Sequence, residues 1–481
     1  MATLCEGRSR ASVKKCKAPH DAGGRSVRPP GPAAVTRPPP LREDLRATLK
    51  LALPAVAQSL LQTLVFLADR FFLGHHSAAA LAAMQVAGPL TWTLQSVFGA
   101  FGVGTLAVIG RAVGAGDRRL ATSALYGSLV PALGLGLVVG LGATLGLDGL
   151  VDLLGGEGAV HGEAARYLGV VLPAMPLLFV AMVCTQALQA GGDTRTPLAI
   201  AVATNAVNLA LNAVLIFGRF GLPRLGARGA AIANVSALAI EASLSLLALS
   251  RRGAAVGLRF DAELDVRDGL RRVLRVSTGA FGERALYHTG YLVYVRITNG
   301  LGPLAMAAHQ ALLSLESVSF LSADGFGVAA GSRVAQRLGA GDPGGARRAG
   351  WIAAAASGAL IAVVAVVLYA GAAPLLRVFL DDPAAVREGV RAMLPGAFVQ
   401  VPMAVSIVLL QSLRGAGSTR EAFAIAVLGS FVVRIAATLV FVRVLHLGLA
   451  GVWLGSGADW ILRAALSAWR WRLGRWARVA V

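Results

Sequence analysis

The sequence predicts an all-α integral membrane protein in which twelve transmembrane helices form two pseudo-symmetric six-helix lobes. Three observations lead to this class: an apolar composition, long segments without charged residues, and an internal repeat. Of the 481 residues, 56% are apolar and only 15% are charged, whereas soluble proteins carry about 25% charged residues. This composition excludes a disordered protein, a coiled coil and an ordinary soluble enzyme. Three cysteines are too few for a disulfide scaffold.

Segments free of Asp, Glu, Lys and Arg indicate the positions of the spans. A helix needs about 20 apolar residues to cross the bilayer core, and backbone groups in lipid must bond internally, which favours helices. In the first half of the chain we expect helices near residues 49–73, 79–113, 118–146, 163–191, 195–219 and 227–250. In the second half we expect them near residues 270–299, 304–338, 345–373, 385–414, 419–444 and 448–472.

Arginines in short loops predict the orientation. Basic loops contain Arg118, Arg195, Arg251, Arg347 and Arg420, and the opposite loops are acidic or mixed, except for a basic loop after the fifth helix. Both termini are therefore expected in the cytoplasm. The net charge of +20 is spread over helix ends, which argues against nucleic-acid binding.

Composition also predicts the domain boundaries. Residues 1–47 are basic and rich in proline, which predicts a disordered cytoplasmic tail. This segment lacks the apolar core of a signal peptide; it could touch anionic lipid or lie upstream of the real start. An N-lobe over 48–250, a cytoplasmic linker over 251–269, a C-lobe over 270–474 and a basic tail over 475–481 complete the predicted organisation.

An internal repeat relates the two lobes. Matches to the segments 80–85, 114–117 and 186–195 recur 225 residues later in one gap-free register. Each repeat holds an even number of helices, so the halves are parallel repeats related by an axis along the membrane normal. Such repeats are typical of transporters that work by alternating access. The repeated Gly-Ala-Gly-Asp of 114–117 is interpreted as a turn and helix cap, with a hinge or latch as the alternative.

With these features the chain resembles the MATE (multidrug and toxic compound extrusion) family of transporters, nearest its DinF-like branch. The resemblance covers roughly residues 48–474 and is carried by segments such as Leu67-Ala-Asp-Arg-Phe-Phe-Leu-Gly74, Gln189-Ala-Gly-Gly-Asp-Thr-Arg195 and Ala307-Ala-His-Gln310. It implies a twelve-helix fold of two lobes. It also implies export of organic, often cationic and amphiphilic compounds, driven by inward flow of protons or sodium ions.

Ionisable residues inside spans are costly, which makes them functional candidates. Asp69 lies near the outer end of the first helix; because burial favours the neutral form of a carboxyl group, it could bind a proton outside and release it inside. On the fifth helix Asn208 and Asn212 share one face. The resemblance places Asp69 and Asn208 in the cation pocket of the N-lobe, and it puts Asn212 where an Asp is common and Asn234 where a Thr is common. The alternatives are an Asp69 paired with Arg70 and asparagines that only join helices.

Three further acids are secondary candidates. Glu283 lies on the seventh helix, where it could simply pair with Arg284. Glu316, on the eighth helix, could face Arg296 or a central cavity. Asp324, on the same helix, could bind a cationic substrate or cap a helix break.

Aromatic and amide side chains are expected to line a substrate cavity, because rings attract organic cations. Anchoring at the membrane interface and helix packing are the alternative roles. His75 and His76 lack a third ligand at a useful spacing, so no metal site is expected. The cavity candidates are Trp92, Gln95, Gln186, Gln189, Tyr287, Tyr291 and Gln411.

The leading hypothesis is a secondary active exporter that needs no cofactor and is not an enzyme. Because Asn212 stands where the family commonly has an Asp, the site has one carboxylate fewer and less charge for a hard cation, which favours H⁺ over Na⁺ as the coupling ion. Expected substrates are small cationic or amphiphilic organic compounds, and the protein is expected to be a lipid-embedded monomer. The alternative is a flippase for lipid-linked precursors. In such a protein Arg296 and Arg434 would face inward and line a large cationic cavity. A membrane-embedded transferase is disfavoured, because the sequence has no Asp-rich loop for a Mg²⁺-diphosphate.

Overall fold

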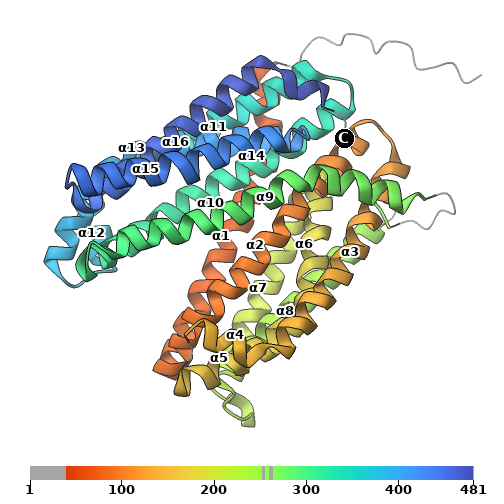
Figure 1. Ribbon diagram of the computed structural model, residues 1–481. Helices are drawn as coiled ribbons and strands as arrows, with labels where there is room; N and C mark the ends of the chain where they lie inside the picture. The colour runs from red at the N-terminus through yellow and green to blue at the C-terminus, as the bar shows by residue number, and fades with distance from the viewer. Residues whose placement is uncertain (1–39, 156, 252–254, 259–263, 480–481) are drawn as a thin grey trace, which may run out of the picture. The chain divides into compact units, whose positions relative to one another are not determined.

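The computed structural model describes residues 40–155, 157–251, 255–258 and 264–479. Within these ranges all regular structure is helical, as the sequence predicts (Figure 1). Residues 1–39 of the predicted tail and part of the predicted linker lie outside them. The first helix begins at Leu41, earlier than the expected residue 49.

The helices follow one another without strands in the described ranges, and short 3₁₀ or π segments join some of them. The first half contains α1 (Leu41–His76), α2 (Ala78–Gly114), α3 (Arg118–Leu145), α4 (Leu147–Leu153), α5 (Gly158–Val171), η1 (Leu172–Ala174), α6 (Met175–Ala190), α7 (Arg195–Leu215), η2 (Arg219–Gly221) and α8 (Gly226–Ser250). The second half contains α9 (Val266–Asn299), α10 (Pro303–Gly339), α11 (Pro343–Ala370), α12 (Ala372–Arg377), α13 (Pro383–Gly415), α14 (Thr419–Val427), η3 (Leu428–Val433), α15 (Arg434–Leu439), η4 (Val440–Val444), α16 (Gly448–Leu473) and η5 (Arg475–Arg478).

These elements account for the twelve predicted spans. Ten helical segments of the described residues are long and apolar enough to cross a membrane. Helices α9 and α16, with 34 and 26 residues, have the length but are less apolar. Their polarity has a physical reason, because both place charged side chains in ion pairs inside the protein. The twelve-helix prediction is thereby confirmed.

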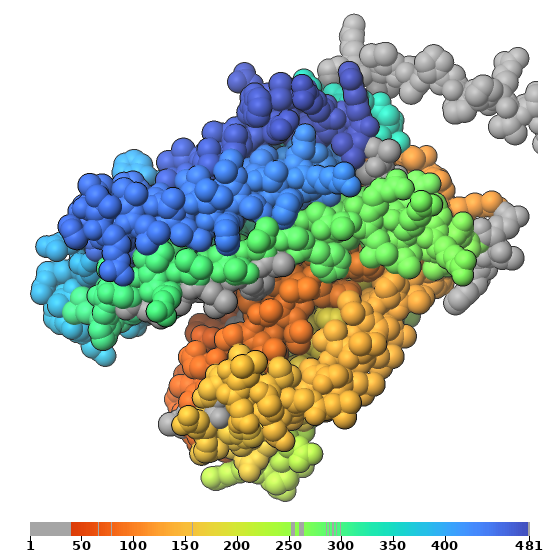
Figure 2. Space-filling model, in the orientation of Figure 1, coloured from red at the N-terminus to blue at the C-terminus, as the bar shows by residue number. Residues whose placement is uncertain are grey.

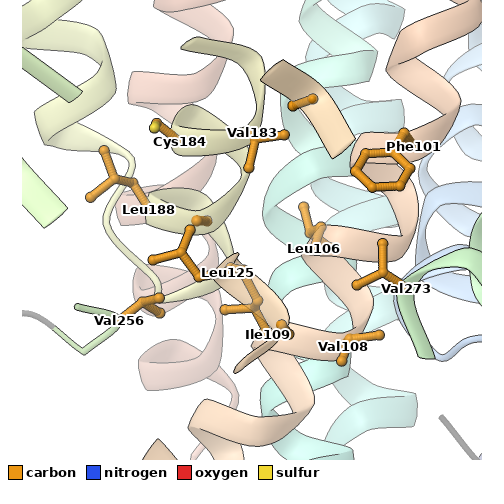
Figure 3. Packing of buried hydrophobic residues seen from close by; sticks show 14 of the residues in the cluster. Phe101, Leu106, Val108, Ile109, Leu125, Val183, Cys184, Leu188, Val256 and Val273 are labelled. Atoms are coloured by element: carbon orange, nitrogen blue, oxygen red, sulfur yellow. The ribbon is translucent and has the colours of Figure 1, made fainter. Parts of the chain in front are cut away.

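Each half has its own hydrophobic cores, and helices α9 and α1 each pack against both halves. Helices α2, α3 and α6 share one core, in which Leu106, Leu125 and Val183 meet (Figure 3). Val273 of α9 belongs to the same core, and α9 also contacts α14 and α15 of its own half. In Figure 2, α9 runs in green along the visible face between the two halves. Helix α1 in turn packs on α10, where its Ala52 joins a core of the second half.

The repeat axis passes through the contact between α2 and α10. A Cβ atom added to Gly110 would lie 2.8 Å from the Cβ of Ala335. Ala335 stands 225 positions after Gly110 and is therefore its repeat equivalent. A residue that touches its own equivalent must lie on the axis that relates the two halves.

Two glycines make this crossing close. A Cβ at Gly114 would lie 1.9 Å from the backbone oxygen of Gln336, and one at Gly339 would lie 2.0 Å from that of Arg111. The two contacts are equivalent, because 225 residues separate Gly114 from Gly339 and Arg111 from Gln336. The backbones of α2 and α10 therefore touch where any larger residue would hold them apart.

Hydrogen bonds cross the same contact in both directions. Arg111 of α2 donates from Nη2 to the carbonyl of Ala416 at the end of α13, over 3.3 Å. Its repeat equivalent, Gln336 of α10, donates from Nε2 to the carbonyl of Ala190 at the end of α6, over 2.7 Å. Each lobe thus supplies at least one donor to a helix end of the other lobe.

The repeated Gly-Ala-Gly-Asp forms a turn and a helix cap, as predicted. Gly116 and Gly341 have φ angles of +71° and +73°, a conformation that favours glycine. The side chains of Asp117 and Asp342 each accept a hydrogen bond from the backbone N–H three residues later. The cap interpretation of this motif is confirmed. Its first glycine, Gly114 in one copy and Gly339 in the other, lies at the close contact between α2 and α10.

A buried ion cluster explains why α1 begins at Leu41. Asp44, in the first turn of α1, is 4% exposed. The Oδ1 atom of Asp44 accepts a hydrogen bond from Nη2 of Arg333 over 2.9 Å. Nη1 of Arg333 donates to the backbone carbonyl of Asp44 and to the hydroxyl of Thr48, each over 2.7 Å. Arg337 and Arg348 lie 3.6 and 3.5 Å from the carboxylate. The start of the first lobe is therefore held by arginines of α10 and α11 in the second.

We expect Asp44→Asn to lower the melting temperature of the purified protein markedly. Removing one partner of a buried ion pair costs about 3–5 kcal/mol, because the other charge stays buried. Tryptophan fluorescence during heating measures the shift. The control is Asp268→Asn, because its pair with Arg272 is more than one-third exposed and such pairs contribute about 0–1 kcal/mol. Equal shifts in the two variants would contradict the role given to Asp44.

Candidate functional site

Four polar side chains of the first half meet inside the helix bundle. Asp69 lies two turns before the end of α1 and is 7% exposed. Asn208 and Asn212 are both buried and lie one turn apart on α7, as their spacing predicts. Asn234 comes from α8. All four residues of the predicted N-lobe site are thus brought together.

These side chains form a closed ring of hydrogen bonds. Asn212 donates from Nδ2 to Oδ1 of Asp69 over 2.7 Å, and Asn234 donates from Nδ2 to Oδ2 of Asp69 over 2.9 Å. Asn208 completes the ring, because it donates to Oδ1 of Asn234 over 2.6 Å and accepts from Nδ2 of Asn212 over 3.0 Å.

The ring has a defined polarity. Both oxygens of Asp69 accept hydrogen bonds, which is the bonding pattern of an ionised carboxyl group. The amide of Asn212 donates to two neighbours, while its own Oδ1 is buried and accepts no hydrogen bond from the described residues. The site therefore holds one carboxylate, two inward-pointing amide donors and one spare carbonyl oxygen.

Sequence reasoning missed one member of this site. The hydroxyl of Tyr167 on α5 accepts a hydrogen bond from Nδ2 of Asn234 over 3.2 Å. Nothing in the spacing of α5 indicates this contact, because the partner lies on a different helix 67 residues away. Arg70, the alternative partner considered for Asp69, is exposed.

The secondary candidates Glu283 and Asp324 belong to one polar chain in the second half. Glu283 of α9 accepts from Nη2 of Arg414, so its partner is on α13 and is not the adjacent Arg284. Nη1 of Arg414 donates to Oε1 of Gln411 over 3.3 Å, and Nε2 of Gln411 donates to Asp324 over 3.2 Å. Helices α9, α10 and α13 are joined by this chain.

Glu316, the third secondary candidate, faces a different arginine from the one expected. It lies half-buried on α10, within electrostatic range of Arg434. Arg296, the partner considered from the sequence, is exposed on α9.

The predicted cavity residues have different environments. Trp92 and Tyr287 are 53% and 37% exposed, and Gln95 and Gln186 are half-buried. Gln189 is buried and donates from Nε2 to Oε1 of Gln58 over 3.2 Å. Gln189 therefore joins α6 to α1, which is the helix-packing role named as its alternative. The side chain of Tyr291 lies outside the described residues.

Comparison with known proteins identifies the class. A family model described as MatE matches residues 54–214 and 280–440, one match in each half. The chain belongs to the MatE family. It is a multi-pass membrane transporter and not an enzyme.

Individual relatives agree with this family. A probable multidrug resistance protein NorM of Thermotoga maritima is 30% identical over 92% of this chain and 95% of its own. An FAD transporter of Shewanella oneidensis is 28% identical over 63% of this chain and 67% of its own. A solved structure titled as the outward-facing conformation of a multidrug resistance MATE family transporter superposes with a TM-score of 0.83. It has 19% identity and covers 89% of this chain and 95% of its own.

Proposed function

We propose that the protein is a secondary active exporter of small organic compounds, driven by inward movement of protons. The buried ring around Asp69 carries this proposal. A single carboxyl group surrounded by amides can take up and release one proton without unpairing another charge in the membrane interior. The similarity to relatives named as multidrug resistance proteins supports the export of organic compounds.

The bonding in the ring favours a proton over sodium. A sodium ion needs several oxygen atoms directed at it, as hard cations generally do. Here the amide groups of Asn212 and Asn234 direct N–H donors at the carboxylate. A proton adds to the carboxyl group itself and needs no such cage.

The remaining expectations belong to the same proposal. The exporter belongs to the DinF-like branch, acts as a monomer in the bacterial inner membrane, and has both termini in the cytoplasm. Its lobes exchange access to the two sides by moving about the α2–α10 contact. Cationic or amphiphilic substrates bind between them, against Trp92, Gln95, Gln186, Tyr287 and Gln411.

A flippase for lipid-linked precursors is the second candidate function. It requires arginines that face a lipid-accessible cavity. The side chain of Arg434 is 14% exposed, which partly meets this requirement. Its Nε and Nη2 groups, however, both donate to Asp459. The exporter hypothesis therefore comes first.

Transport by the full-length protein in proteoliposomes tests the proposal. With a pH gradient imposed, we expect fluorescent organic cations to move against the proton flow. A sodium gradient at equal pH should give no movement. Sodium-driven transport would overturn the choice of coupling ion. Movement of a lipid-linked diphosphate, with no movement of any organic cation, would replace the exporter by the flippase.

A further inference from the structure

A second buried charge cluster lies in the C-lobe, away from the Asp69 ring. Asp459 of α16 is 0% exposed, and Arg463 donates to its two oxygens from Nε and Nη2, each over 2.5 Å. Arg434, the first residue of α15, donates to Oδ2 from Nε over 2.9 Å and from Nη2 over 2.7 Å. Gly429 makes room for this cluster, because a Cβ there would lie 2.3 Å from Oδ1 of Asp459.

This cluster contains one positive charge more than Asp459 can neutralise. The side chains of Arg434 and Arg463 are only 14% and 8% exposed, and buried charges require partners. Aromatic rings offset part of the cost: Cζ of Arg463 lies 3.6 Å from the ring centroid of Trp460, and that of Arg434 lies 5.7 Å from the centroid of Tyr294. The remaining charge attracts an anion.

Glu316 supplies a negative charge near Arg434 and leaves the Nη1 group of that arginine available as a donor. It lies within electrostatic range of Arg434, yet the two side chains form no ion pair within 4 Å in the described part of the chain. Nη1 of Arg434 likewise has no hydrogen bond there. Tyr287, 37% exposed, lies within electrostatic range of both arginines, so the cluster borders on accessible surface.

Local backbone structure marks the same place. The π-helical segments η3 and η4 stand directly before and after α15, at whose start Arg434 lies. Such segments are frequent at functional sites. The internal repeat adds a contrast, because Tyr294 stands 225 positions after Asp69. At the position where the N-lobe has Asp69, the C-lobe therefore has Tyr294, whose ring lies beside the guanidinium of Arg434.

We propose that Arg434 binds the acidic group of an organic ligand, a carboxylate or a phosphate, and that Glu316 is the counter-ion that this group replaces. The proposal rests on the export function, because it names a substrate class: an aromatic amphiphile that carries an acid. Nη1 of Arg434, which Asp459 leaves unused, suits this recognition, since it can donate a charge-assisted hydrogen bond to a carboxylate or phosphate oxygen. The rings of Tyr287 and Tyr294 would contact the aromatic body.

A matched pair of dyes tests the proposal by binding alone. Rhodamine 19 and rhodamine 6G share one cationic ring system, but the carboxylate of the first is an ethyl ester in the second. Fluorescence polarisation with the purified full-length protein in nanodiscs should show tighter binding of rhodamine 19. Arg434→Gln should weaken rhodamine 19 by about tenfold or more, the value of one charge-assisted hydrogen bond, and leave rhodamine 6G unchanged. Asp459 keeps Arg463 in this variant.

Glu316→Gln provides a test in the opposite direction. Removing the competing carboxylate should strengthen rhodamine 19 binding, a gain that a misfolded variant cannot produce. Arg296→Gln removes an exposed arginine of the same lobe and should change neither dye. An unchanged dye ratio in both Arg434→Gln and Glu316→Gln would overturn the proposal, as would a wild-type protein that does not prefer rhodamine 19.

The lipid composition of the nanodiscs identifies the source of the acid. With phosphatidylcholine alone, rhodamine 19 should bind as stated, and added phosphatidylglycerol should not displace it. Displacement that Arg434→Gln abolishes would support the acid-binding site but assign it to a lipid headgroup. These measurements need no ion gradient. A failure of proton-driven transport would therefore count against the export function and leave the assignment of Arg434 to be decided by binding.

Discussion

Replacement of Asp69 by asparagine is expected to reduce proton-driven transport to the level of empty liposomes. An asparagine has nearly the same shape, but its NH2 group replaces an oxygen that accepts a hydrogen bond, so one of the four hydrogen bonds of the ring is lost. It cannot bind a proton at neutral pH, and no other ionisable group belongs to the ring except the hydroxyl of Tyr167. Uptake of a fluorescent organic cation into proteoliposomes, driven by an imposed pH gradient, measures the loss.

The matched control is Asp148→Asn, which removes the same charge from an exposed position in the first turn of α4. This variant should transport at the wild-type rate. Folding of the Asp69 variant is checked by its melting temperature and by dye binding without a gradient. Gradient-driven transport that survives in Asp69→Asn would show that the coupling proton binds elsewhere, with Glu283, Glu316 and Asp324 as the next residues to change.

The second large effect is expected at the helix crossing. A single methyl group at Gly114 would approach the backbone oxygen of Gln336 to 1.9 Å, far inside van der Waals contact. Backbone atoms cannot move aside as a flexible side chain can, so Gly114→Ala should force α2 and α10 apart. Overpacking of this kind costs about 1–3 kcal/mol, and occasionally more. We expect a lower melting temperature together with strongly reduced transport.

Gly134→Ala is the matched control for this variant. Gly134 lies exposed on α3 and nothing approaches its Cβ position within 4 Å. The change there should leave stability equal or slightly higher, because alanine favours helix more than glycine by about 1 kcal/mol. Gly339→Ala, the repeat equivalent, should resemble Gly114→Ala. Wild-type stability in both crossing variants would mean that the close contact is dispensable.

Sequence patterns were sufficient wherever the information is local. Charge-free length placed the helices, and the Gly-Ala-Gly-Asp motif defined its own turn and cap. The four-residue spacing of Asn208 and Asn212 put both amides on one face. Its place inside a span already made Asp69 a candidate. The resemblance to known transporters grouped it with Asn208, Asn212 and Asn234, and the four do meet in one ring.

Contacts between distant helices could not be predicted in this way. Arg434 and Asp459 are 25 residues apart on separate helices, and Tyr167 is 67 residues from Asn234. Their meeting depends on how whole helices pack, which no local periodicity encodes. Asp44 is a further case, because its partner Arg333 lies 289 residues away. This contact stabilises a helix in a segment whose composition favoured a disordered tail.

The contact between Gly110 and Ala335 has a consequence for how the two halves of the chain can vary. Residues that face their own equivalents characterise the interface of a symmetric homodimer, in which one surface patch pairs with itself. The fold thus has, within one polypeptide, the geometry of a dimer of half-length subunits. In such a dimer every substitution at the axis would occur twice and would have to tolerate its own copy. A single chain is free of that restriction, because the two copies of an axis position are separate residues and can differ, as Arg111 and Gln336 do.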